Sequence, residues 1–269
     1  MSSYLEKPKV SVVTVCYNAA SDLELTITSV LSQTFKSMEY IIIDGGSQDG
    51  TLDVINNYKD GISFFVSEKD QGVYDAMNKG VDYAHGEWVV FMNAGDAFYD
   101  NNVLGKVFSR TYENSVGVIY GDVNLVFPNC GNVIKRFDSI KGKEQPLSIC
   151  HQATLTRRDY LKEIKFNLSY RITADALLFY SLWEKGVQFE YIPVCIANFE
   201  SVTGLSSTKY VLAFKERSKI VGETWYNSPN WWIGYAKAVV KTVLRGIQPR
   251  AKYEMHFYER IAKRYNPGS

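Results

Sequence analysis

The first hundred residues alternate between short apolar runs and stretches in which apolar residues recur at helical spacing. The apolar runs, which are rich in branched residues, lie at positions 10–15, 40–43, 63–67 and 88–92. Between the first two, Leu23, Ile27 and Val30 share one helical face, and Ser21 with Glu24 forms a capping-box signature. Strands that alternate with helices in this way predict an α/β protein. Its Rossmann-like sheet should be mostly parallel, with helices on both faces.

Polar residues lie at or just after the end of each run. Parallel strands place their carboxyl ends on one edge of the sheet, where open α/β sheets bind ligands. The candidate residues on this edge are Thr14, Cys16, Tyr17, Asn18, Asp44, Gly46, Asp70, Gln71, Asn93, Ala94 and Asp96. A site so rich in carboxylates suits a divalent cation that holds a phosphorylated ligand. For Asp44 alone, a helix-capping role at the turn before Thr51 is equally compatible with the sequence.

After Asp96 the pattern becomes irregular. It predicts strands over 116–120, 123–127, 132–137, 151–155 and 191–199, the second and third of which form a hairpin. A helix should run from Ile172 to Lys185 and end at Gly186. A mixed half of this kind, attached to a nucleotide-type half, would supply the pocket for a second substrate.

The last sixty residues read as mostly helical and basic. Lys237, Lys241 and Arg245 form one stripe at helical spacing. Another side carries Val239, Val240, Val243 and Ile247, and the aromatic residues before them are Trp225, Tyr226, Trp231, Trp232 and Tyr235. Two interpretations fit: an interfacial helix at a membrane surface, or a helix packed on the domain with a solvated basic face.

Composition narrows the classes of function. The net charge of the 269 residues is +1, which disfavours a nucleic-acid-binding surface over the whole protein. Residues 205–269 hold 12 Lys and Arg against 4 Asp and Glu, a local +8 that leaves −7 for the rest. The four cysteines form no CxxC pair, which suits reduced thiols in a cytoplasmic protein. Apolar runs are too short for a transmembrane helix, and we expect no signal peptide.

Several motifs, taken together, resemble the family-2 glycosyltransferases. They are Thr14-Val15-Cys16-Tyr17-Asn18, Asp44-Gly45-Gly46-Ser47-Gln48-Asp49-Gly50-Thr51 and Asn93-Ala94-Gly95-Asp96. The segments 67–80, 151–153, 173–175 and 201–206 are similar to the bacterial branch that builds colanic acid, capsules and O-antigens. The resemblance implies a GT-A domain over 1–206, with a nucleotide-sugar half (8–100) and an acceptor half (101–206). A basic, aromatic helical extension over 207–269 lies outside it.

The resemblance also implies an inverting transfer from a nucleotide-sugar, usually a UDP-sugar. Asp44 would accept the uracil imide hydrogen, Thr14 and Tyr17 would line the base pocket, and Asp96 would bind Mn²⁺ or Mg²⁺. The remaining donor-binding positions would be Cys16, Asn18, Gly46, Asp70, Gln71, Asn93 and Ala94. The family often has aspartates where this chain has Asn93 and Gly95. Metal affinity in the absence of the donor should therefore be weak.

The acceptor side depends on three residues. Asp175 would be the general base, since a sugar hydroxyl needs a proton acceptor within hydrogen-bonding reach; a helix N-cap is the alternative. His151 and Arg171 would contact the acceptor or a diphosphate, and for His151 a structural hydrogen bond is the alternative. For Asn78 we expect a structural hydrogen bond.

The predicted function is the extension of a polyprenyl-diphosphate-linked saccharide at the inner face of the bacterial inner membrane, with a homo-oligomer left open. The alternatives are a sugar nucleotidyltransferase and a non-catalytic sugar-nucleotide-binding protein. The first of these usually carries a glycine-rich basic loop after its first strand, which the segment 16–20 lacks.

Overall fold

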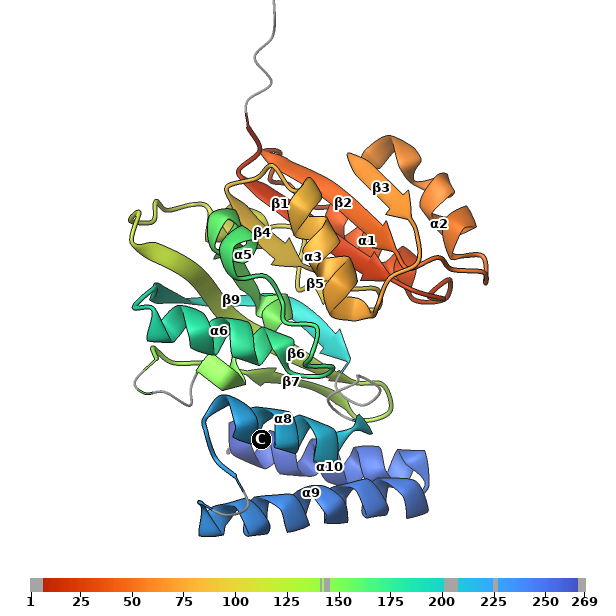
Figure 1. Cartoon of the computed structure of the whole chain (residues 1–269). Coiled ribbons are helices and arrows are strands. Elements are labelled where there is room, and N and C mark those ends of the chain that lie inside the picture. The colour runs from red at the N-terminus through yellow and green to blue at the C-terminus, as the bar shows by residue number, and fades with distance from the viewer. Residues whose placement is uncertain (1–6, 141, 143–145, 201–207, 225–226, 266–269) are drawn as a thin grey trace, which may run out of the picture.

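The computed structural model describes residues 7–140, 142, 146–200, 208–224 and 227–265 (Figure 1). Its strands are β1 (Val10–Cys16), β2 (Met38–Asp44), β3 (Phe64–Ser67), β4 (Trp88–Phe91), β5 (Ala97–Phe98), β6 (Val116–Phe127), β7 (Gly131–Lys135), β8 (Thr154–Arg157) and β9 (Gln188–Glu200). Its helices are α1 (Leu23–Leu31), α2 (Thr51–Asn57), α3 (Val73–Tyr83), α4 (Val103–Val107), α5 (Arg158–Ile164), α6 (Ala174–Glu184), α8 (Tyr210–Ile220), α9 (Pro229–Ile247) and α10 (Arg250–Tyr265).

All the described strands belong to one nine-stranded sheet. The strand order is β3-β2-β1-β4-β8-β6-β9-β5, with β7 paired to β6. The strands β3, β2, β1 and β4 are parallel. Because β8 is antiparallel to both β4 and β6, β6 and its parallel partner β9 run in the same direction as the first four. The prediction of an α/β protein with a mostly parallel sheet is confirmed.

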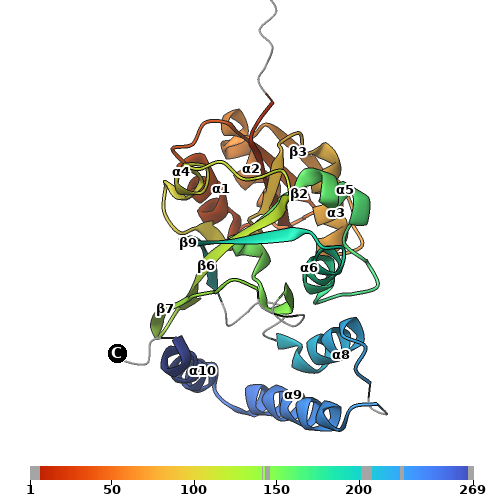
Figure 2. The ribbon, with the colours of Figure 1, turned by 90° about the vertical axis from the view of Figure 1, so that its left-hand side faces the viewer.

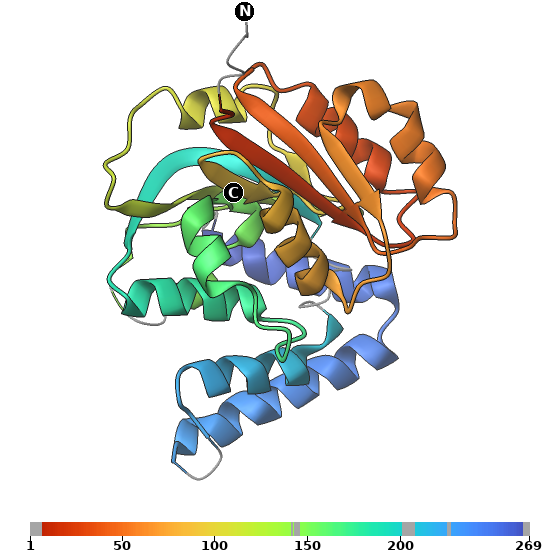
Figure 3. The same cartoon turned by 45° about the horizontal axis from the view of Figure 1, so that its top comes forward.

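The first strands are buried on both faces of the sheet. Ile42 packs with α1 and α2, whereas Ile41 and Ile43 pack with α3 on the opposite face. Figure 3 shows α1 and α2, in red and orange, on one side of these strands and α3, in gold, on the other. Helices on both sides explain why these strands are apolar at successive positions instead of alternating.

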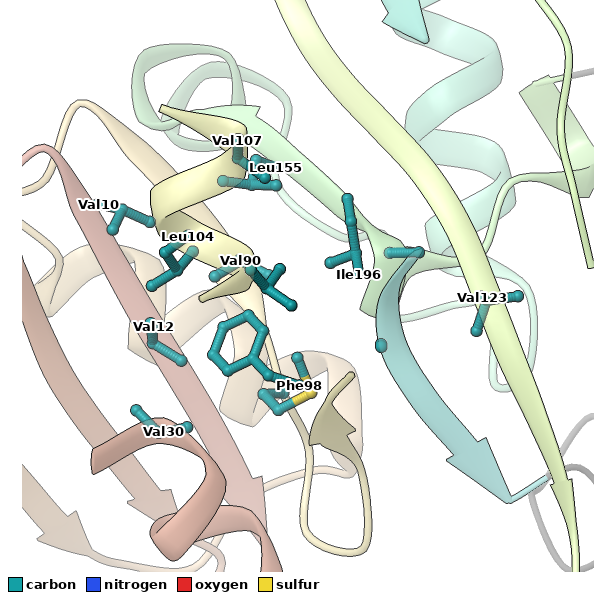
Figure 4. Close-up of a cluster of buried hydrophobic side chains, with 14 of the residues drawn as sticks. Val10, Val12, Val30, Val90, Phe98, Leu104, Val107, Val123, Leu155 and Ile196 are labelled. Carbon is teal, nitrogen blue, oxygen red and sulfur yellow. The ribbon is translucent and has the colours of Figure 1, made fainter. Parts of the chain in front are cut away.

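A continuous core joins the two halves of the sheet. Figure 4 shows Val12 of β1 and Val90 of β4 near Leu155 of β8 and Ile196 of β9, and all four are buried in one cluster. The strands that follow Asp96 are therefore packed against the nucleotide-type half. This packing fixes the polar residues of one half relative to those of the other.

The predicted break after residue 120 is wrong. β6 runs without interruption from Val116 to Phe127, and β9 follows it with register shifts near Tyr120 and Asp122. A Cβ on Gly121 would lie 2.3 Å from the carbonyl oxygen of Val194. The glycine therefore allows the two backbones to stay in contact where the strands bend.

Two local predictions also need correction. Residues 151–155 form a 3₁₀ turn, His151–Ala153, before β8 begins at Thr154. The capping box is absent: α1 starts at Leu23, and Glu24 instead accepts a hydrogen bond of 2.7 Å from the Tyr58 hydroxyl. A partner distant in sequence has replaced the local one.

The three C-terminal helices pack below the sheet, as the blue elements of Figure 2 show. In α10, the buried carboxylate of Glu254 accepts hydrogen bonds from the backbone and side-chain nitrogens of Asn129, at 2.8 and 2.7 Å. Phe214 of α8 packs edge-on against Trp231 of α9. Within the described ranges, none of the helices has the length and apolar character needed to span a bilayer.

Candidate active site

The loop after β2 supplies hydrogen-bond donors to the carboxylate of Asp44. Asp44 is fully buried and accepts hydrogen bonds from the backbone nitrogens of Gly46 and Ser47, at 3.0 and 2.9 Å. The hydroxyls of Ser47 and Ser67 donate to it as well, at 2.5 and 2.6 Å. Burial raises the pKa of Asp44, but these hydrogen bonds outweigh it and hold the pKa below its ordinary value. Asp44 thus shapes the loop.

Three predicted donor-binding residues hold neighbouring loops in place. Thr14 is fully buried and donates its hydroxyl to the carbonyl oxygen of Met92 at 2.7 Å. The buried Cys16 thiol lies 3.6 Å from a carboxylate oxygen of Asp44. Asn18 accepts a hydrogen bond of 3.0 Å from the backbone nitrogen of Gln48. Thr14 and Cys16 therefore lie behind the predicted base pocket and support it.

Tyr17, Asp70 and Gln71 form the accessible part of that region. Tyr17 is 64% exposed, and a Cβ on Gly45 would lie 3.3 Å from its ring and 2.5 Å from a carboxylate oxygen of Asp70. A larger residue at position 45 would have to displace the Asp70 carboxylate. Gly46, at φ +84°, adopts the left-handed conformation that completes the turn.

The edge after β4 differs from the loop after β2. Asp96 is only 6% exposed, and burial raises its pKa to about 7, although the charge of His151 and a hydrogen bond from Gln152 act in the opposite direction. Next to it, the side-chain oxygen of Asn93 is buried without a hydrogen-bond partner among the described residues. Thr26 of α1 holds the turn by donating to the carbonyl oxygen of Asp96 at 2.7 Å.

His151 connects this edge to Asp175. Its Nε2 lies 3.2 Å from the side-chain nitrogen of Asn93, and its Nδ1 lies 3.1 Å from Oδ2 of Asp175. The tautomer that satisfies both contacts accepts from Asn93 and donates to Asp175. Residues from the turn after β4, the 3₁₀ turn and α6 thus meet, although up to 82 positions separate them in sequence.

Asp175 and His151 shift each other's pKa values. Burial raises the pKa of Asp175, but the hydrogen bond and charge of His151 outweigh it and lower the pKa below its ordinary value. For His151, burial lowers the pKa, but Asp175 and Asp96 raise it above its ordinary value. Oδ1 of Asp175 also lies 3.1 Å from the hydroxyl of Tyr74, a residue that we did not predict as part of the site.

A second unpredicted residue, Glu216 of α8, supports the turn before Asp175. Its buried carboxylate accepts hydrogen bonds from the backbone nitrogens of Arg171, Ile172 and Thr173, at 2.8, 3.0 and 3.0 Å. A buried carboxylate satisfied by three N–H groups fixes the backbone that leads into α6. The extension therefore contributes to the geometry around Asp175, although the predicted boundary at residue 206 separates the two.

These residues face a large cavity of about 1330 Å³. It is lined on one side by Asn93, Ala94, Asp96, His151, Arg171 and Asp175, and on the other by residues of α8, α9 and α10. Among the described residues, the predicted donor-binding positions Tyr17, Asp44, Asp70 and Gln71 are not part of its lining. The structure therefore places the predicted catalytic and acceptor residues in one cavity and these four donor-binding positions outside its lining.

The residues at the β4 edge fit a divalent cation held mainly by other ligands. The described residues contain no group of three or more His, Cys, Asp or Glu side chains placed to hold a metal. The buried Asp96 carboxylate and the unpartnered Asn93 oxygen nevertheless provide two hard oxygen ligands. Mg²⁺ and Mn²⁺ accept such ligands together with phosphate oxygens and water.

Asn78 is not available to the site. Its side-chain amide donates to the carbonyl oxygen of Phe166 and accepts from the backbone nitrogen of the same residue.

Known proteins are similar to this chain in sequence and in fold. A family model described as glycosyl transferase family 2 matches residues 11–185. The chain is 32% identical over 216 residues to a PGL/p-HBAD biosynthesis glycosyltransferase of Mycobacterium tuberculosis, covering 75% of this chain and 80% of the relative. It is 27% identical over 194 residues to a cholesterol galactosyltransferase of Borreliella burgdorferi, covering 71% and 51%.

Two solved structures confirm the predicted GT-A fold. A mannosyltransferase from Pyrobaculum calidifontis in complex with GDP-Man and Mn²⁺ superposes with a TM-score of 0.63 at 15% identity, covering 98% of this chain and 83% of that one. S. aureus TarS 1–349 in complex with UDP-GlcNAc gives a TM-score of 0.60 at 14% identity, covering 89% and 73%. Because the family model matches more than half of this chain, the chain belongs to glycosyltransferase family 2.

Proposed function

We propose that the protein transfers a sugar, with inversion, from a UDP-sugar to a lipid-linked saccharide used in bacterial surface polysaccharide assembly. The observation that carries this proposal is that His151 contacts Asn93, in the turn that also holds Asp96, on one side and Asp175 on the other, and that all four residues line one cavity. One carboxylate, Asp96, would hold the cation that binds the donor's diphosphate. The other, Asp175, would accept the proton of the acceptor's hydroxyl. An inverting displacement needs these two functions at the two ends of one reacting centre.

Asp175 would act as the general base. The acceptor hydroxyl loses its proton to Asp175 as its oxygen forms a bond to the anomeric carbon, and the bond from that carbon to the diphosphate breaks. Tyr74 and His151 contact the two oxygens of Asp175 and hold the carboxylate in orientation. Its lowered pKa keeps Asp175 ionised near neutral pH, so that it is ready to accept the proton.

Asp96 and Asn93 would hold the divalent cation together with the donor's phosphates. When bound, the ion neutralises the charge that develops on the departing diphosphate. The solved neighbours carry UDP-GlcNAc in one case and GDP-Man with Mn²⁺ in the other, which supports a metal-bound nucleotide-sugar here.

The nucleotide base would lie at the accessible surface formed by Tyr17, Asp70 and Gln71. A base can stack on the exposed ring of Tyr17. The carboxylate of Asp44, already bonded by four donors, supports this surface from behind. Reading of the uracil imide by Asp44 would require one of those donors to move.

We also propose that α9 lies on a membrane surface. Ile233, Val240, Val243 and Ile247 follow helical spacing and are more than half exposed, up to 72% for Ile247. Lys237 and Lys241 line the cavity instead. An apolar face turned outward is the reverse of the usual orientation for a helix in water, and it suits the boundary of a bilayer.

A donor panel tests the enzymatic proposal. Thermal shifts should be measured with UDP-, GDP- and dTDP-sugars in the presence of Mn²⁺, with and without EDTA. We expect the largest rise in melting temperature with a UDP-sugar and loss of most of that rise in EDTA. Equal, small shifts with every nucleotide would contradict the assignment. Release of pyrophosphate from UTP and a sugar 1-phosphate would instead identify a nucleotidyltransferase.

Liposome sedimentation tests the membrane proposal. Replacing Val240, Val243 and Ile247 by serine should reduce binding to anionic vesicles at least tenfold, since each replacement removes exposed apolar surface. Leu168→Ser, at an exposed apolar residue outside the extension, is the matched control. Unchanged sedimentation of the triple variant would remove α9 as the membrane contact. This design preserves the Glu216 contacts of α8, which a deletion of the whole extension would destroy.

A further inference from the structure

The charged residues on the extension's side of the cavity are all cations. The described lining residues from β7, α8, α9 and α10 include five cations and no carboxylate: Lys135, Arg217, Lys237, Lys241 and Arg250. The carboxylates that line the same cavity, Asp22, Asp96, Asp175 and Glu200, come from other elements, together with one cation, Arg171. The carboxylates and most of the cations therefore come from different parts of the fold.

Lys135 is the innermost of these cations. Its ammonium group donates to the carbonyl oxygen of Ser148 at 3.0 Å and lies 4.4 Å from the centre of the Phe137 ring. Burial lowers the pKa of Lys135, and the charges of Arg217 and Arg264 lower it further. These two arginines line an adjoining pocket together with Lys135. The three side chains thus form one group of like charges, which we call the cation cluster.

The cation cluster lies next to the candidate catalytic residues. Cys150 immediately precedes His151, and its thiol is influenced by Lys135 as well as by Asp96 and Asp175. Arg217 in turn contributes to the lowered pKa of Asp175. An anion bound by Lys135 and Arg217 would therefore be adjacent to the proposed base.

Asp138 also lines the adjoining pocket, but the described part of the chain places no carboxylate in an ion pair with the cluster. None of the ion pairs between described residues includes Lys135, Arg217 or Arg264. Lys135 is partly buried and the two arginines are exposed. A bound anion would relieve the repulsion between these three like charges. Two arginines and a lysine provide many N–H donors in the arrangement that phosphate groups require.

The neighbouring lining is apolar. Ala213 and Phe214 of α8, Gly234 and Ala238 of α9, and Phe257 and Ile261 of α10 line the same cavity. A Cβ on Gly234 would lie 2.4 Å from the ring of Phe214, so the glycine allows these two helices to pack closely. An apolar passage next to a cation cluster matches a molecule with an anionic head and a hydrocarbon chain. A free phosphate would gain no contact from that apolar lining.

We propose that Lys135, Arg217 and Arg264 bind the diphosphate of a lipid-linked acceptor, whose first isoprene units lie between α8, α9 and α10. This inference rests on the proposed transfer reaction, because it orients the acceptor so that its sugar reaches Asp175. The outward apolar face of α9 would then let the lipid pass directly from the bilayer into the cavity. The site is distinct from the donor's diphosphate site at Asp96.

Calorimetric titration of the full chain with farnesyl diphosphate tests the proposal. We expect the double variant Lys135→Gln/Arg217→Gln to weaken binding roughly ten- to a hundredfold, because two charge-assisted contacts to phosphate are lost. The control Lys252→Gln/Lys263→Gln removes the same charge from exposed positions of α10 and should bind within twofold of the wild type. Inorganic pyrophosphate and farnesol should each bind at least tenfold more weakly than farnesyl diphosphate.

Equal farnesyl diphosphate affinity in the wild type and the cluster variant would overturn the site. Pyrophosphate that binds as tightly as farnesyl diphosphate would overturn its assignment to a lipid. Titration of the same variant with UDP and Mn²⁺ separates this inference from the proposed function. We expect UDP affinity within twofold of the wild type, and a parallel loss of UDP binding would place the cluster in the donor site instead. Melting curves should show that the cluster variant folds, with a stability equal to or above that of the wild type, since mutual repulsion is relieved.

Discussion

Asp44 and Asp96 each lie at the carboxyl end of a central strand, yet their surroundings differ. Asp44 accepts four hydrogen bonds from its own loop and from Ser67, which lower its pKa. Asp96 is also buried, but its pKa is raised to about 7, and the nearby amide oxygen of Asn93 has no hydrogen-bond partner in the described part of the chain. A carboxylate saturated by protein donors is structural, whereas one that protein donors leave undersatisfied is suited to an incoming cation.

The largest expected effect concerns Asp175, which His151 connects to the turn that holds Asp96. Asp175→Asn should lower kcat by about 10² or more, because the amide cannot take the acceptor's proton. UDP binding with Mn²⁺ should stay within about twofold of the wild type. Tyr74→Phe, which removes one contact to Asp175, should cost roughly tenfold or less. Full turnover by Asp175→Asn would show that another group is the base.

Replacement of Asp44 should lower the stability of the fold. Asp44→Ala leaves two backbone N–H groups and two hydroxyls without their acceptor, so we expect a loss of about 3 kcal/mol in the free energy of unfolding. Urea denaturation measures it. Asp96→Asn is the matched control, and its metal-free stability should be unchanged or higher. If both variants lose the same stability, the distinction between the two carboxylates is wrong.

Glu216 extends the comparison to a third buried carboxylate. Glu216→Gln replaces one acceptor oxygen with a donor that faces the backbone nitrogens of residues 171–173. We expect a loss of about 2 kcal/mol in stability and a fall in kcat of roughly tenfold, because the turn before Asp175 loosens. The exposed Glu223→Gln should change neither quantity. Lost stability with unchanged kcat would show that Glu216 does not position Asp175.

The smallest effect is a pH dependence. Because the pKa of Asp96 is raised to about 7, protons compete with the cation below that pH. Mn²⁺ affinity in the presence of UDP should therefore rise with pH up to about 7 and then level off, and a flat profile between pH 5.5 and 8 would contradict this. The same proton stabilises the metal-free fold at low pH. That contribution is lost as the pH rises through 7, and Asp96→Asn should not show it.

The donor half could be predicted from sequence because its determinants are local. Each strand there is a short apolar run followed by its own turn and helix, so periodicity located β1 to β4 to within two residues. Asp96 and Asn93 follow from the same rule. Thr14 shows its limit, since a polar residue near a strand end can point into the core and bond a neighbouring strand.

The acceptor half depends on contacts that sequence spacing does not reveal. Tyr74 and Asp175 are 101 positions apart, and Glu216 reaches a turn more than 40 residues before it. The cation cluster joins β7, α8 and the end of α10. The only signal for Glu216 in the sequence is that it is one of just four acids in a basic extension. Its partners are backbone N–H groups, which every sequence contains.

Titration of UDP into the wild type and Asp96→Asn, each with and without Mn²⁺, tests most directly whether Asp96 holds the cation. We expect Mn²⁺ to strengthen UDP binding by the wild type at least tenfold and to have no effect on the variant, while both bind UDP similarly without metal. A Mn²⁺ effect of equal size in both proteins would contradict the central claim that the edge after β4 holds the cation and the donor's diphosphate.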